Sequence, residues 1–414
     1  MHRPATHFPP TRAEALARLE RFLPRAGRHY ATRRNEDRGP GDRAGVSLLS
    51  PYIRHRMITE RAVLAAILAR HPLEEASKFV EEVLWRTYWK GWLQHRPGVF
   101  EHYRLGLLAD RAELAREIGL RRRYEEAIEG RTGIEGFDDW ARELVETGYL
   151  HNHARMWFSS IWIFTLRLPW RLGAEFFMRH LLDGDPASNT LSWRWTAGLH
   201  TPGKTYLARR DNIARYTGGR FSPDNLARRA DPIVEEPPPP PRLVPSPDPV
   251  PATEIALLVT EEDLSPESWA LDGARVRAIL LTSGVDSRTP DGASPNVRHF
   301  VARALEDARI RAQDHFDVPA MIVPLEASAI AAAARQVGAR ALVTAEAATG
   351  PVAGALAVLR VQLADEGLPL ARIARPFDRR FWPHATRGFF AFRKEIPTLL
   401  AEELGAPLGP DPSP

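Results

Sequence analysis

The segment at 235–251 constrains the fold most, because it holds five consecutive prolines and four more that alternate with other residues. Proline fixes φ and lacks a backbone N–H, so such a run favours an extended polyproline II path over a helix or a central strand. We interpret residues 231–253 as a semi-rigid linker. A ligand for an SH3-type domain is the alternative. A chain of 414 residues is long enough for two domains.

Before the linker the sequence predicts helices. Apolar residues recur at three- and four-residue spacing over 59–70 and 74–95. A further amphipathic stretch over 138–147 is followed by Gly148, a residue type that often ends helices. Strand signals are almost absent, so residues 1–230 are expected to form an all-helical domain.

After the linker, short apolar runs with β-branched residues alternate with helical stretches. The runs are 255–260, 276–282, 321–323 and 341–344, and the helical stretches are 296–313, 326–336 and 351–366. This alternation predicts a doubly wound parallel sheet, an α/β domain over 254–404, with a disordered tail at 405–414. No glycine-rich dinucleotide fingerprint follows the first run, so we expect no nicotinamide site there.

Composition excludes several classes of protein. The chain has no Cys, which excludes disulfide frameworks, thiolate metal sites and iron–sulfur clusters. No apolar run reaches the length of a membrane helix and the N-terminus lacks an apolar signal region, so we expect a cytoplasmic protein. Residues 1–230 carry a net charge of +11 and residues 231–414 a net charge of −7. A basic first half suits an anionic partner such as nucleic acid, and arginine-rich, solvated helix faces are the alternative.

Polar and charged residues recur among aromatic ones between Thr147 and Trp195. The stretch includes Asn152 and Arg155, then an Asp-Gly-Asp at 183–185, and then two closely spaced tryptophans. Burying such groups in a helical core is costly unless each finds a partner. The pattern therefore indicates a bound polar cofactor beside a stacking partner.

This series resembles the FAD-binding helical domain of the photolyase/cryptochrome family, over roughly residues 14–220. Typical members carry an α/β antenna domain before the helical domain, whereas here the α/β region follows it. Residues 375–394 resemble the segment with which the family's α/β domain ends. The resemblance thus implies two domains in swapped order, and a possible antenna chromophore of unknown identity.

The resemblance also implies which residues bind FAD. The stretch at 30–34 resembles the family's Tyr-x-x-x-Arg, and Val46–Tyr52 resembles its phosphate loop, with Val46 in place of Thr and a four-residue insertion before the loop. Ser50 followed by Pro51 predicts a helix cap there. The implied cofactor residues are Tyr30, Arg34, Ser47, Leu49, Ser50, Arg86, Asn152, Arg155, Asp183, Asp185 and Asn189. A pair between Arg155 and Asp183 would offset the cost of burying either charge.

A second group of residues resembles the family's pocket for a cyclobutane pyrimidine dimer. Glu82, Trp85, Arg86 and Trp89 share one helix face by their spacing. The resemblance implies that Glu82 hydrogen-bonds the flipped pyrimidines, for which burial would have to raise its pKa, and that aromatic side chains stack on them. The implied pocket residues are Glu82, Trp85, Asn152, Met156 and Trp195.

Residues 152 and 153 distinguish this pocket from those of other family members. His153 stands where the family has Arg, while Arg34 remains as a basic contact. Asn152 disfavours the (6-4) photolyases, whose matching motif carries His.

The family reduces its flavin through a chain of three tryptophans. Trp193 and Trp170 match the inner and middle members, but the outer position falls at Glu117. The candidates for a terminal electron donor in its place are Tyr124, Trp157 and Trp162, and a truncated electron path is the alternative.

Three functions therefore remain open. The first is blue-light-driven repair of pyrimidine dimers in DNA with reduced FAD. The second is a cryptochrome-like photoreceptor that signals to a protein partner through the redox state of its flavin. The third is a nucleic-acid-binding helical protein without flavin.

Overall fold

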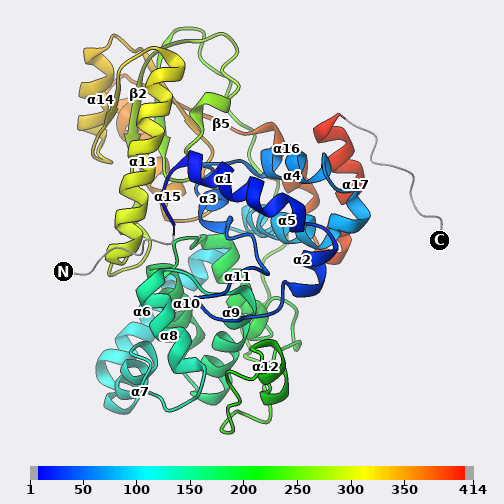
Figure 1. Cartoon of the computed structure of the whole chain (residues 1–414). Coiled ribbons are helices and arrows are strands. Elements are labelled where there is room, and N and C mark those ends of the chain that lie inside the picture. Colours follow the sequence, from blue (N-terminus) through cyan, green and yellow to red (C-terminus); the bar gives the residue numbers. More distant parts are fainter. Residues whose placement is uncertain (1–7, 406–414) are drawn as a thin grey trace.

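The computed structural model describes residues 8–405, and the first half of this range is helical (Figure 1). Its helices are α1 (Arg12–Phe22), η1 (Leu23–Arg25), α2 (Arg28–Arg33), α3 (Ser50–Arg54), α4 (Glu60–Leu68), α5 (Leu73–His95), α6 (Gly98–Arg116), α7 (Ile118–Ile128), α8 (Phe137–Thr147), α9 (Asn152–Ser160), η2 (Ile161–Thr165), α10 (Trp170–His180), α11 (Pro186–Thr196) and α12 (Arg210–Tyr216). The tail predicted at 405–414 lies outside the described residues except for Gly405.

The helices that the sequence predicts correspond to α4, α5 and α8, and Gly148 ends α8 in the left-handed region at φ 69°. The predicted cap at Ser50 is wrong. Helix α3 begins at Ser50 itself, after Leu49, and no side chain caps it. The Ser50 side chain interacts with the Asp183 carboxylate and makes no hydrogen bond to a backbone N–H of its own helix.

After residue 253 the chain forms one parallel sheet with helices around it. Its strands are β1 (Glu254–Thr260), β2 (Arg275–Thr282), β3 (Ala320–Ile322), β4 (Ala341–Ala345) and β5 (Leu370–Ile373), in the order β3-β2-β1-β4-β5. The accompanying helices are η3 (Pro266–Ser268), η4 (Val285–Ser287), α13 (Pro295–Phe316), α14 (Ala327–Gln336), α15 (Pro351–Asp365), α16 (Pro376–Phe381), η5 (Trp382–His384) and α17 (Phe389–Leu404). The predicted doubly wound fold is confirmed.

Strand β5 is an edge strand that the sequence analysis missed. It spans four residues, includes Arg372, and pairs in parallel with β4. A strand that is short and only partly apolar carries too weak a periodic signal to be recognised.

One face of the sheet packs on helices of the first half of the chain, and the other face packs on helices of the second half. Alternate side chains of β1, such as Leu257 and Val259, belong to a core that includes α13 and residues of α1 to α5. The intervening side chains, such as Leu258, pack on α14 and α15. Because successive side chains of a strand point to opposite faces, one face is covered by α14 and α15 and the other by α13 and the first helices.

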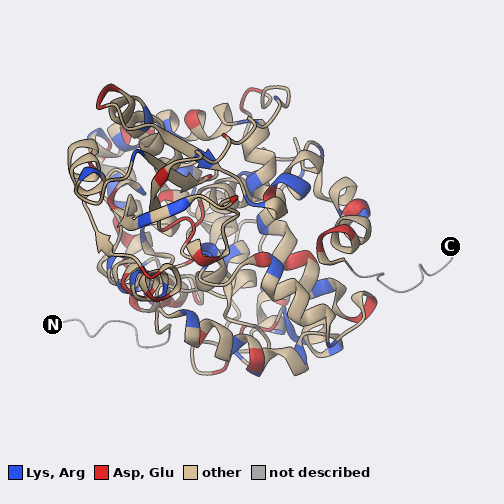
Figure 2. Ribbon diagram, turned by 90° about the horizontal axis from the view of Figure 1, so that it is seen from above, with Lys and Arg blue, Asp and Glu red and all other residues tan. Residues whose placement is uncertain are grey.

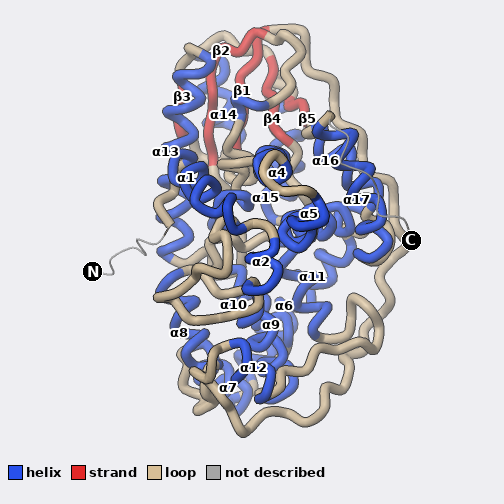
Figure 3. The backbone as a smooth tube through the Cα atoms, turned by 45° about the vertical axis from the view of Figure 1, so that its right-hand side comes forward, coloured by secondary structure: helices blue, strands red, loops and turns tan. Residues whose placement is uncertain are grey.

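Between α12 and β1 the chain forms neither helix nor strand, and it runs along one side of the molecule (Figure 3). Hydrogen bonds hold this segment to both halves. Arg242 donates its N–H to the His95 carbonyl at 2.9 Å, and Asp248 exchanges backbone and side-chain bonds with Arg372 of β5, each of 2.8 Å. Within residues 8–405, no helix combines the length and the apolarity needed to cross a membrane.

Candidate functional site

A cavity of about 700 Å³ opens among α2, the segment before α3, and helices α5, α9 and α11. Its volume lies within the range of small-molecule and cofactor sites. The structure brings together here all residues that the sequence analysis assigns to the cofactor: Tyr30, Arg34, Ser47, Leu49, Ser50, Arg86, Asn152, Arg155, Asp183, Asp185 and Asn189. The residues assigned to the dimer pocket also line it: Glu82, Trp85, Asn152, Met156 and Trp195.

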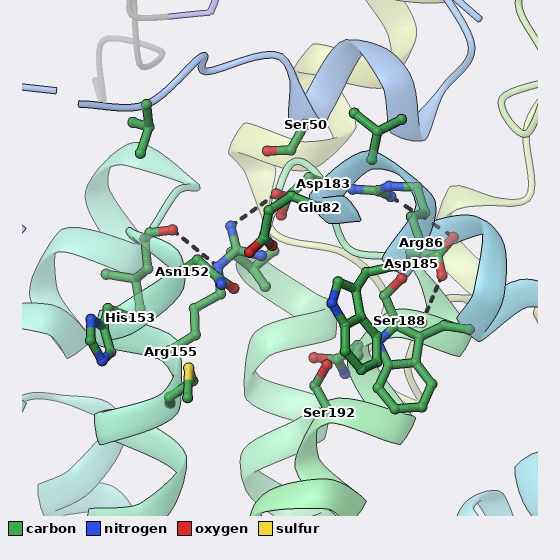
Figure 4. Close-up of a pocket in the computed structure, with 18 of the residues that line it drawn as sticks. Ser50, Glu82, Arg86, Asn152, His153, Arg155, Asp183, Asp185, Ser188 and Ser192 are labelled. Atoms are coloured by element: carbon green, nitrogen blue, oxygen red, sulfur yellow. Dashed lines mark hydrogen bonds and ion pairs between the residues drawn. The ribbon is translucent and has the colours of Figure 1, made fainter. Parts of the chain in front are cut away.

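Asp185 forms the most charged part of the cavity wall (Figure 4). It is the N-cap of α11, and its carboxylate accepts the Ser188 N–H at 2.8 Å. Three cationic side chains lie within 4.0 Å of the same carboxylate, namely Lys90, Arg54 and Arg86. Burial opposes ionisation of Asp185, but these cations outweigh it and hold the pKa well below its ordinary value. The lowered pKa favours an ionised Asp185, which can only accept hydrogen bonds.

Asp183 and Arg155 form the expected buried pair, at 2.9 Å, and face one another in Figure 4. Arg155 also donates through Nε to the Leu150 carbonyl at 3.0 Å, which fixes the guanidinium. Burial raises the pKa of Asp183, but Arg155, Arg86 and Ser50 together lower it by more, so the net shift is downward. The carboxylate thus stays ionised inside the cavity wall.

Several buried polar atoms around the cavity have no hydrogen-bond partner among the described residues. They are Arg34 Nε, Arg86 Nη1, Asp183 Oδ1, Ser188 Oγ and Trp193 Nε1. Leaving a buried polar group unpaired costs about 1–3 kcal/mol. The set offers guanidinium donors for phosphates, and a hydroxyl and a carboxylate for ring and ribityl groups. These donors and acceptors fit the FAD that the sequence predicts.

Asn189 is held by its own hydrogen bond. Its Nδ2 donates to the Ala174 carbonyl at 2.8 Å. The amide is therefore fixed against α10, with its oxygen left for a ligand in the cavity.

The wall assigned to the dimer contains one ion pair. Glu82 accepts from Arg34 Nη1 at 2.8 Å, so the basic contact expected of Arg34 is joined to Glu82. Burial raises the pKa of Glu82, Arg34 lowers it, and the net shift is upward. His153 lies on the same side and stacks on Trp157, with ring centroids 4.4 Å apart.

Each aromatic side chain assigned to the dimer has one face covered. Trp85 stacks on Phe389 of α17, with centroids 3.6 Å apart and planes 10° apart. Trp195 stacks on Tyr206 at 5.5 Å. Because both tryptophans also line the cavity, each has a surface left for a ligand.

No ring contact within the described residues joins Trp193 to Trp170, the expected inner and middle members of the electron path. Among ring contacts of the described residues, Trp193 meets Trp162 at 6.2 Å, and Trp162 meets Tyr124 at 5.9 Å. Trp170 does not line the cavity. Its ring contacts Tyr103 at 5.6 Å, and its Nε1 donates to Glu235 of the linker segment at 3.1 Å. The exposed Glu117 lies between α6 and α7.

Gly173 explains why Trp193 and Trp162 approach one another. A Cβ at this position would lie 2.3 Å from Trp193 Cη2 and 2.9 Å from Trp162 Nε1. Any larger residue would push the two rings apart. Of the candidates for a replacement donor, the structure therefore links Trp162 and Tyr124 to Trp193.

Sequence analysis missed several residues that lie in or next to the cavity wall. Arg54 forms a bidentate ion pair with Glu262, the second residue after β1. Its Nη1 and Nη2 donate to the two carboxylate oxygens at 2.7 and 2.6 Å. Lys90 is 3% exposed and follows Arg86 by one helical turn, a spacing that could have revealed it. Phe390 of α17 also lines the cavity. No local signal connects Glu262 or Phe390 with the motifs of the helical half.

Comparisons with known proteins match the helical half of the chain. Residues 79–233 match the family described as the FAD binding domain of DNA photolyase. The chain is 37% identical over 204 residues to a deoxyribodipyrimidine photo-lyase of Thermus thermophilus, covering 48% of this chain and 45% of that protein. It is 28% identical over 205 residues to the enzyme of the same name from Escherichia coli, covering 49% and 42%.

The similarity is partial. The chain spans less than half of the length of these curated relatives. A solved structure of a class III photolyase from Agrobacterium tumefaciens is 27% identical, with a TM-score of 0.43, and the match covers 50% of this chain and 43% of that one.

Proposed function

Because the helical half of this chain belongs to the photolyase/cryptochrome family, we propose that the protein binds FAD and repairs cyclobutane pyrimidine dimers in DNA under blue light. The observation that carries this proposal is the single cavity in which charged and unpaired polar groups suited to FAD lie beside Glu82, Trp85 and Trp195. When bound and reduced, FAD supplies on excitation one electron that splits the dimer and then returns.

The chain's own residues bind and orient the two ligands. The ionised Asp185 and Asp183 would accept hydrogen bonds from the cofactor, and Arg86 would hold its phosphates. Asn189, whose amide is fixed by its bond to Ala174, would offer its side-chain oxygen to the isoalloxazine. The cofactor carries the redox chemistry, and the protein supplies position and electrostatics.

The dimer would be bound after it leaves the duplex. Extracting a damaged, poorly stacked pair costs a few kcal/mol. Stacking on the free surfaces of Trp85 and Trp195, at about 1–3 kcal/mol for each base, offsets that cost. Glu82, whose net pKa shift is upward, would donate a hydrogen bond to the pyrimidine carbonyls in its protonated form.

Any antenna chromophore would need a place outside the usual crevice of a doubly wound sheet. That crevice lies at the carboxyl ends of the strands where the strand order reverses, here between β1 and β4. It is filled by the helical half, because Arg54 binds Glu262 and Gln94 Nε2 donates to Glu346 at 3.2 Å.

The second candidate function is a photoreceptor. The observation that favours it is the buried contact from Asp185 in the cavity to Arg54, and from Arg54 to Glu262 of the α/β domain. A change of charge at the cofactor would act on this contact and, through it, on the packing of the two halves.

Illumination of the purified protein tests the proposal. Protein loaded with FAD and chemically reduced is mixed with an oligonucleotide that holds one thymine dimer. Blue light should restore the ultraviolet absorbance of the thymines, and the same mixture in the dark should not. A loaded protein that leaves the dimer intact under light would contradict repair and support the photoreceptor.

A further inference from the structure

Helix α17 brings two aromatic side chains to the cavity from the far end of the chain. It belongs to the α/β half, and it packs on α5 beside α16 (Figure 1). Phe389 is buried against Trp85, as described above, and the next residue, Phe390, lines the cavity. The surface around Trp85 is thus shared by two parts of the chain that are about 300 positions apart.

Phe390 is 76% exposed, and it is the only aromatic residue among the exposed large apolar side chains in the described range. A lone exposed apolar residue is ordinary. This one is unusual by its place, because it lines the cavity beside the stack of Trp85 on Phe389. Aromatic side chains in such positions serve as platforms for unpaired bases.

The charges around Phe390 are mainly positive. Lys394 follows it by four residues and therefore lies on the same face of α17. Arg387 precedes the helix, and both basic side chains are exposed without an ion pair among the described residues. Figure 2 shows Lys and Arg interspersed with Asp and Glu on many other elements.

The neighbouring acidic groups of α5 are already neutralised. Glu81 pairs with Arg393 at 2.7 Å and with Lys78 at 3.5 Å. Glu82 of α5 pairs with Arg34. On α17 itself, Glu395 is the acidic residue near Phe390. The surface around the opening therefore complements an anionic strand more than an acidic or neutral protein surface.

We propose that α17 forms part of the DNA interface, in which Phe390 stacks on the base next to the extracted dimer and Lys394 contacts a backbone phosphate. This inference rests on the proposed function and adds a binding element to it. The α/β half then contacts the substrate directly, through a helix that its packing against Trp85 holds in place.

Binding measurements on the full-length, FAD-loaded protein test this inference. The probe is a fluorescently labelled single strand with one thymine dimer, and its undamaged counterpart serves as competitor. Phe390→Ala should weaken binding of the dimer strand about 5- to 100-fold, the range of one lost base–aromatic contact. Phe390→Trp keeps an aromatic ring at this position and should bind the dimer strand about as tightly as the unsubstituted protein does. Lys394→Ala should reduce the slope of log affinity against log salt by about one.

Matched variants separate the possible outcomes. Ile118→Ala removes an apolar side chain that is 81% exposed on α7, outside the cavity lining, and should leave binding unchanged. If Trp85→Ala weakens binding while Phe390→Ala stays within twofold of the unsubstituted protein, the role of α17 is wrong and the proposed function stands. If Phe390→Trp binds the dimer strand as weakly as Phe390→Ala does, the proposed stacking of residue 390 on a base is wrong. If neither Trp85→Ala nor Phe390→Ala changes binding, the proposed function fails as well.

Discussion

Replacing Glu262 by Gln should destabilise the protein strongly, although this residue lies outside the helical half. Its carboxylate accepts two hydrogen bonds from Arg54, and the two side chains are 9% and 2% exposed. Opposite charges about 4 Å apart attract by about 4 kcal/mol at an effective dielectric constant near 20. The variant leaves Arg54 buried with Asp185 as its nearest carboxylate, at 3.9 Å. We expect a loss of about 3–5 kcal/mol in the free energy of unfolding.

Urea denaturation followed by tryptophan fluorescence measures this loss. Arg54→Met should cost a similar amount, and the double variant should cost clearly less than the sum, because neither charge then remains unpaired. Glu101→Gln is the control, since its exposed pair with Arg104 should contribute less than about 1 kcal/mol. If the loss of stability in the double variant equals the sum of the two single losses within about 0.5 kcal/mol, Arg54 and Glu262 are not coupled.

The stability that the pair of Glu262 with Arg54 contributes depends on pH. Burial raises the pKa of Glu262, Arg54 lowers it, and the net shift is below the ordinary value. The pair therefore stabilises the protein fully above about pH 4.5, and this contribution is lost as the pH falls through the lower pKa of the folded state. The difference in stability between the unsubstituted protein and Glu262→Gln should accordingly shrink in acid.

Three further predictions follow from the proposed function. Trp195→Ala should weaken binding of a dimer-containing strand about 10- to 100-fold in a fluorescence anisotropy titration, and unchanged binding would contradict its stacking role. Trp162→Phe should slow light-driven reduction of the bound flavin by an added thiol more than Trp170→Phe does, because Trp162 contacts Trp193; a larger effect of Trp170→Phe would refute this route. The repair rate should fall as the pH rises through the raised pKa of Glu82, and Glu82→Gln should abolish that dependence; equally flat profiles would exclude a protonated Glu82.

Much of the local structure follows from short-range patterns in the sequence. The periodicity over 74–95 and the glycine at 148 predict α5 and the end of α8, because spacing and left-handed backbone are local properties. The blocks around Asn152, Arg155 and Asp183 predict one site, and the structure places all three along the same cavity. Such blocks are recognisable because a polar group in an apolar helix must have a partner.

The sequence by itself thus determined the helical and α/β halves, the proline-rich connection and the side chains gathered around the cavity. Tertiary structure alone decided that Glu262 neutralises Arg54, that Phe389 covers Trp85, and that Trp193 meets Trp162. The first two contacts join residues more than 200 positions apart, and the third depends on the space left by Gly173. Periodicity and composition carry no information on such pairings, because they arise only when separate elements pack together.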